Sequence, residues 1–184
     1  QAIVVISGGI DLSIGSIMAL TSVISASLMK TYPELAIAIV IGVLLLGILI
    51  GAMNGGLVVV TRVPDIVVTL AMSFVWAGCA LLVLKTPGGA AAVWLKDLVK
   101  GPLLVEWLPK AAVVMIILVA VISIPLRRTR LGLLIYAIGS NNLAAFRSGV
   151  AVGRTRIAAY ALAGLFSAMG GLVLTMSTGI GAPI

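Results

Sequence analysis

The sequence predicts an all-α polytopic membrane protein, a single bundle of transmembrane helices that takes in the whole chain, 1–184. The first observation is composition: the chain is 62% hydrophobic and 9% charged, too few polar residues to cover a soluble globule. The second is that several charge-free runs are long enough to cross a hydrocarbon core of about 30 Å as helices. The third is the placement of lysine and arginine between the apolar runs, as in loops that orient membrane helices. We expect about five complete spans.

The same composition argues against several classes of function. The chain has one cysteine, Cys79, and no histidine, so we expect no disulfide framework, no metal site and no histidine-based catalysis. We therefore predict no cofactor and no enzymatic activity. The formal net charge of +7 comes from residues between apolar spans, so we expect a lipid bilayer rather than nucleic acid around this protein.

The polar turn Gly8–Ser16 organises the rest of the chain. Asp11 lies among apolar residues, and a charge at the centre of a membrane helix costs about 2.5–3.5 kcal/mol on insertion scales. One interpretation is that Asp11 caps the helix that follows, in its first turn. The other is that this turn borders a translocation path, with candidate residues Gly9, Asp11, Ser13 and Ser16.

The first elements follow from the apolar runs. The stretch 1–7 reads as the end of a span whose beginning is missing, because the chain starts without methionine inside an apolar run, and we expect a fragment. Leu12–Met29 predicts a first complete helix of about 27 Å at 1.5 Å per residue. A loop at Lys30–Glu34 follows, where Pro33 cannot continue a helix interior.

The second span, Leu35–Val60, would be about 39 Å long, so it should tilt or fray at its end. Gly47, Gly51 and Gly55 recur at every fourth residue and share one face, which lets another helix pack closely. Asn54 lies beside them. It either forms an interhelical hydrogen bond or contacts substrate.

The remaining elements are assigned in the same way. We expect a turn containing Pro64, spans at Ile66–Leu84, Ala111–Leu126 and Ile157–Met176, and a basic segment at Arg127–Arg156. Small residues at helical spacing in the last span predict close packing. In the connection between the third and fourth spans, Val93–Lys100 is either a short interfacial helix or an ordinary loop.

Counting crossings places all arginines at one side of the membrane and all lysines at the other. The seven arginines against five lysines favour the arginine side as cytoplasmic.

Two separated motifs resemble one family. Ile6–Ser16 strongly resembles the glycine-aspartate signature of bacterial ABC importer permeases of the ribose, xylose, arabinose and galactose group. The second match is Leu131-Gly132, Tyr136–Gly139, Asn141-Asn142, Ala144-Ala145 and Ser148–Val150, continuing to Pro183. The order and spacing of the two blocks also match, and the resemblance covers essentially the whole chain.

The resemblance implies a permease subunit of an ATP-driven importer of a monosaccharide or similar small solute in the bacterial inner membrane. Its implied partners are an ATP-binding cassette subunit, a periplasmic solute-binding protein and a second permease copy, as a homodimer. The stretch 127–156 would be the cytoplasmic coupling segment, a short helix over 141–150 ended by glycine. Its coupling residues would be Gly139, Asn141, Ala144, Ala145, Ser148 and Gly149.

One residue departs from the family pattern. Many members carry an acidic residue directly before the paired alanines, where this chain has Leu143, so a charge contact at that position is not carried over. The alternative function is a secondary, ion-coupled transporter. That class typically has an inverted repeat and intramembrane ion-coupling groups, whereas this sequence offers one candidate carboxylate and no convincing repeat.

Overall fold

A computed structural model describes residues 1–99, 110, 113, 116–117, 120–121, 124 and 128–183. In these parts of the chain the named elements are all helical. They are α1 (Ala2–Ile6), α2 (Ile14–Thr31), the 3-10 turn η1 (Pro33–Leu35), α3 (Ala36–Thr61), α4 (Asp65–Val83), α5 (Val93–Val99), α7 (Arg130–Ser140), α8 (Asn142–Arg147) and α9 (Val152–Thr178). Helices α2, α3, α4 and α9 are long and apolar enough to cross a membrane, which confirms the predicted fold class. The span predicted at Ala111–Leu126 lies largely outside the described residues.

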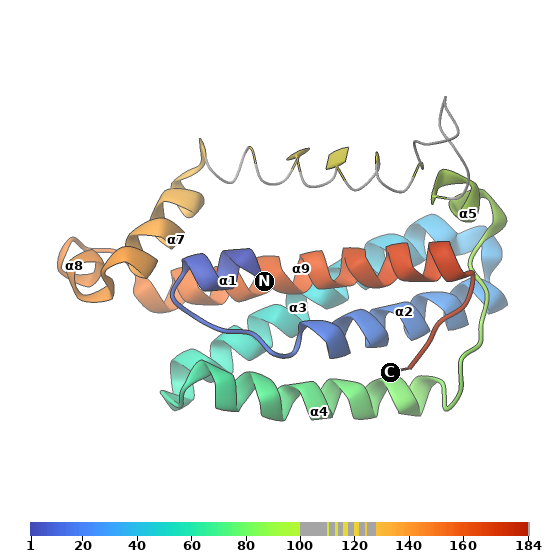
Figure 1. Ribbon diagram of the computed structural model, residues 1–184, viewed down its shortest axis with the longest axis horizontal. Coiled ribbons are helices and arrows are strands. Elements are labelled where there is room, and N and C mark those ends of the chain that lie inside the picture. Colours follow the sequence, from blue (N-terminus) through green and yellow to red (C-terminus); the bar gives the residue numbers. More distant parts are fainter. Residues whose placement is uncertain are drawn as a thin grey trace.

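The four long helices form one bundle with α9 against its middle (Figure 1). The α9 helix packs along α3 and also against α2, and α2 packs on α4. One end of the bundle, the arginine end, contains the turn after α1, the α3–α4 junction, α7 and α8. The opposite end, the lysine end, contains α5, the α2–α3 junction and the C-terminus of α9.

The helix boundaries differ from the predictions in physically interpretable ways. The α3 helix does not fray at its C-terminal end. It stays helical to Thr61, and Arg62 ends it in the left-handed conformation, with φ of 58°. The α9 helix begins at Val152, five residues before the predicted start. The prediction began later because Arg154 and Arg156, which lie in the first turns of α9, were counted as part of the basic segment. Helix α7 was not predicted. It lies in a segment rich in arginine and glycine, so the apolar pattern of a short amphipathic helix was not recognised in the sequence.

Three glycines of α3, the glycine seam Gly47, Gly51 and Gly55, lie against α9 at the closest helix approach. A Cβ atom at Gly47 would lie 2.5 Å from Cβ of Ala168, and one at Gly55 would lie 2.8 Å from Cβ of Tyr160. At Gly51 it would collide with the backbone carbonyl of Tyr160. Because these three residues have no side chain, the two backbones come into contact. Such close packing is expected for helices that associate in lipid without a hydrophobic driving force.

The stretch left open between helix and loop is a helix, α5, at the lysine end. Leu95 is buried at 4% exposure in a cluster with Met29 and Leu172, whereas Val93 and Trp94 are exposed. The apolar residues of α5 are therefore divided between the bundle and the surface. The exposed tryptophan suits a membrane interface.

Candidate functional site

Asp11 lies in the turn before α2 and is 2% exposed. Its Oδ1 accepts hydrogen bonds from the backbone nitrogen of Ser13 at 2.8 Å and from Oγ of Ser13 at 2.6 Å. The helix begins at Ile14 with Ser13 as its N-cap residue, so the prediction that Asp11 sits inside the first turn is wrong. The carboxylate instead closes a local turn onto Ser13, a bond that aspartate readily makes two residues ahead of itself. We call the stretch 8–13 the Asp11 turn.

A chain of hydrogen bonds links the Asp11 turn to two further helices. Nδ2 of Asn54 on α3 donates to Oγ of Ser13 at 2.7 Å, and Nε1 of Trp76 on α4 donates to Oδ1 of Asn54 at 3.2 Å. The hydroxyl of Ser13 donates its hydrogen bond to Asp11, so every hydrogen bond in this series is donated in the direction of the carboxylate. Asp11 Oδ2 is buried and has no hydrogen-bond partner among the residues that the structure describes. One carboxylate oxygen is thus held by the network and the other is left available.

The two remaining candidates, Gly9 in the Asp11 turn and Ser16 in the first turn of α2, have local structural roles. Oγ of Ser16 donates to the backbone carbonyl of Ser13 at 2.8 Å, which uses its single proton within α2. Gly9 lies where a Cβ atom would be 2.5 Å from Oδ2 of Asp65 and 3.1 Å from the hydroxyl of Tyr160. A side chain at Gly9 would therefore displace the Asp11 turn from the groups beneath it.

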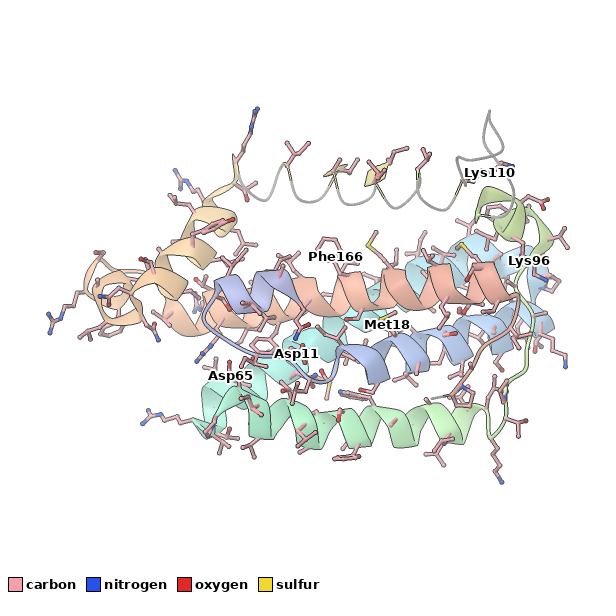
Figure 2. The ribbon with its side chains drawn as sticks, viewed as in Figure 1. Asp11, Met18, Asp65, Lys96, Lys110 and Phe166 are labelled. Carbon is pink, nitrogen blue, oxygen red and sulfur yellow. The ribbon has the colours of Figure 1, made fainter. Side chains whose placement is uncertain are left out.

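Four residues that contact or support this turn were missed from the sequence. The hydroxyl of Tyr160 on α9 donates to Oδ2 of Asp65 at 2.8 Å, and Nη2 of Arg156 forms an ion pair with the same oxygen at 3.3 Å. Thr69 on α4 accepts from the backbone nitrogen of Leu12 at 3.1 Å. Figure 2 shows Asp11 and Asp65 at the same end of the bundle. The available sequence signal was Asp65 at the start of a helix, which the sequence analysis interprets only as part of the turn containing Pro64.

Helix α8 is short and capped at both ends. Oδ1 of Asn141 accepts from the backbone nitrogen of Ala144 at 2.9 Å, the standard N-cap bond. Gly149 has φ of +84°, its nitrogen donates to the carbonyl of Phe146 at 3.0 Å, and the nitrogen of Val150 donates to that of Ala145 at 3.1 Å. This pair of bonds is a Schellman motif. The short helix predicted for this segment is therefore present, with glycine at its end.

The exposed face of α8 is apolar. Leu143 is 60% and Phe146 66% exposed, and both line an open groove of about 350 Å³. Ala144 and Ser148 are also exposed, whereas Ala145 is buried at 6% and does not lie on the exposed face.

Gly139 at the end of α7 belongs to a different contact. A Cβ atom there would collide with the backbone carbonyl of Ile6, so Gly139 lets α7 rest directly on the end of α1. Its position supports the start of the Asp11 turn rather than the exposed face of α8. Among the described residues, no group of three or more histidine, cysteine, aspartate or glutamate side chains could hold a metal ion.

Comparison with known proteins identifies the family. A family model described as the permease component of branched-chain amino acid transport systems matches residues 1–184. The chain belongs to this permease family. It is also 33% identical over 179 residues to the autoinducer 2 import system permease protein LsrD of Escherichia coli strain K12 and of Shigella flexneri, matches that cover 93% of this chain and 53% of each relative. The chain thus spans about half the length of these curated relatives. No solved structure matches it significantly.

Proposed function

We propose that this chain is part of the permease subunit of an ATP-driven importer that moves a monosaccharide or a similarly small polar solute across the bacterial inner membrane. The observation that supports this most is the match of the whole chain to a permease family. The relatives named above are import-system permeases, and the sequence resembles monosaccharide permeases at both of its motifs.

The arginine end is the cytoplasmic end in this proposal, and α8 is the docking element for an ATP-binding cassette subunit. Its two caps hold the helix, and its exposed Phe146 supplies an aromatic side chain of the kind enriched at protein interfaces, with the exposed Leu143 beside it. Leu143 replaces the acidic residue of many family members, so the contact here is apolar at that position. The solute-binding protein would dock at the lysine end, and a second permease copy would complete the pathway.

The Asp11 turn borders the translocation path in this proposal. Its Oδ2, which has no partner in the described part of the chain, can accept a hydrogen bond from a solute hydroxyl or from water, while Ser13 holds the other oxygen and is itself held by Asn54. Gly9 and Ser16 shape the turn without offering a free polar group.

Copurification tests the docking surface. We expect Leu143→Glu combined with Phe146→Glu to remove the ATP-binding subunit from the purified complex while the permease remains in the membrane, because two buried carboxylates would oppose an apolar contact. Trp94→Glu at the lysine end is the matched control and should retain the subunit. Full retention by the α8 variant would exclude α8 as the docking element.

A further inference from the structure

The hydroxyl of Tyr160 has one proton and two acceptors on different parts of the molecule. One is Oδ2 of Asp65 on α4 at 2.8 Å, and the other is the carbonyl of Ile10 in the Asp11 turn at 3.3 Å. Tyr160 is 0% exposed, so these two groups are the acceptors that the described protein offers this proton. Because a hydroxyl donates only one hydrogen, the bond to Ile10 strengthens when Asp65 moves away.

Thr69 presents the same choice from the opposite side of the turn. Its hydroxyl is 2.8 Å from the backbone carbonyl of Asp65 and 3.4 Å from that of Ile10, while the same oxygen accepts from Leu12. Two buried hydroxyls therefore lie within reach of the carbonyl of Ile10, Tyr160 while bonded to the carboxylate of Asp65 and Thr69 while bonded to its backbone carbonyl within α4. In both cases Asp65 holds the shorter bond.

Asp65 is in turn held by the helix that continues from α8. Arg156 pairs with its carboxylate at 3.3 Å, and Arg156 and Tyr160 are four residues apart on one face of α9. Only 148–151 separates α8 from the start of α9. Because this connection is short, a displacement of α8 would act on the start of α9, the helix that carries both groups that bind Asp65.

A second contact joins the same segment to the Asp11 turn. Gly139 of α7 lies against the carbonyl of Ile6, two residues before Gly8, where the turn begins with φ of +81°. The α7–α8 segment thus reaches the Asp11 turn through α1 on one side and through α9 on the other.

We propose that Asp65 and Tyr160 are positioning residues that couple the Asp11 turn to the α7–α8 segment, so that nucleotide-driven movement of α8 redistributes the hydrogen bond of Tyr160 between Asp65 and Ile10, while Thr69 holds the turn from α4. This inference rests on the proposed function, because it requires an ATP-binding subunit on α8. Substrate contact by Tyr160 or Asp65 is not part of it.

Maleimide labelling tests this coupling without a known solute. Ile10 is 40% exposed, so Ile10→Cys, in a protein with Cys79→Ser, reports on the turn through its rate of reaction with a fluorescent maleimide. The rate is compared between the nucleotide-free complex and the complex trapped with ATP and vanadate. The expected difference is about fivefold, the population shift that one typical net hydrogen bond produces.

In the Tyr160→Phe and Asp65→Asn proteins the difference should fall to near unity while vanadate trapping persists. The double variant should lose no more than either single variant, because coupled residues do not add. Tyr136→Phe removes the same hydroxyl from a half-exposed tyrosine on α7 and should keep the full response. Thr69→Val should lose the response and Thr69→Ser should retain it, which gives a second test if Tyr160→Phe does not assemble.

An unchanged response in Tyr160→Phe, or additive losses in the double variant, would overturn the coupling. So would the absence of any nucleotide response in the unsubstituted complex that still hydrolyses ATP. Failure of the unsubstituted permease to retain an ATP-binding subunit is a different result, and it would overturn the proposed function together with this inference.

Discussion

Nδ2 of Asn54 lies 2.7 Å from Oγ of Ser13 and donates a hydrogen bond to it between α3 and the start of α2. Both side chains are completely buried. Asn54 also accepts from Trp76 on α4, so one amide group joins three helices around the Asp11 turn. The stability of this end of the bundle should depend on that amide.

Asn54→Ala should lower the free energy of unfolding by about 1–3 kcal/mol, the usual cost of leaving buried polar partners unsatisfied. Thermal unfolding of the purified permease in detergent measures it. Asn142→Ala removes the same group from an exposed position and should change stability little. Equal changes in unfolding temperature for the two substitutions would show that the hydrogen bonds of Asn54 contribute nothing to stability.

The glycine seam predicts opposite effects for two glycines of α3. Gly51→Ala should destabilise the protein by about 1–3 kcal/mol, a typical cost of overpacking, because its Cβ would meet the backbone of Tyr160. Gly56→Ala should be neutral or stabilising by up to about 1 kcal/mol from helix propensity, because nothing lies within 4 Å of its Cβ. Unfolding midpoints of both variants check this, and a stable Gly51→Ala protein contradicts it.

Asn141 should control the order of α8. Asn141→Ala removes the N-cap bond to Ala144, which typically costs about 0.5–2 kcal/mol. Hydrogen exchange of the amides in α8 should therefore become faster, whereas Asn142→Ala inside the helix should leave exchange nearly unchanged. Equal protection in both variants would show that the cap does not hold the helix.

Cysteine labelling in intact cells tests the orientation of the bundle. With Cys79→Ser, a cysteine at Lys96 should react with an impermeant maleimide added outside, and one at the exposed Ser140 should react only after the membrane is opened. These residues lie at the lysine and arginine ends. Labelling of position 140 from outside would reverse the orientation.

The fold class and four of the five spans could be predicted from the sequence because apolar length and charge-free runs depend only on the chain itself. The glycines of the seam were detectable for the same reason, since their spacing of four is local. Helix α7 was missed because its amphipathic pattern is short and lies beside arginines. The Asp11 turn was recognised as a polar feature at membrane depth, although the helix begins three residues after Asp11 rather than directly after it.

The partners of the Asp11 turn could not be predicted, because they come from distant parts of the chain. Thr69 is 57 positions from Leu12, and Tyr160 is 95 from Asp65. No spacing rule connects such residues in a single sequence. The burial of Ala145 could not be predicted either, because it depends on packing with neighbouring helices, which a small residue in a polar segment does not reveal.

Solute uptake into proteoliposomes tests the central claim most directly. The permease is reconstituted with its ATP-binding subunit and solute-binding protein, and uptake of radiolabelled ribose, xylose, arabinose and galactose is measured with ATP on the arginine side. ATP-driven import predicts that at least one sugar accumulates only with ATP, and that accumulation persists when ionophores collapse all ion gradients. Accumulation driven by an ion gradient in the absence of ATP would contradict the account and identify a secondary transporter.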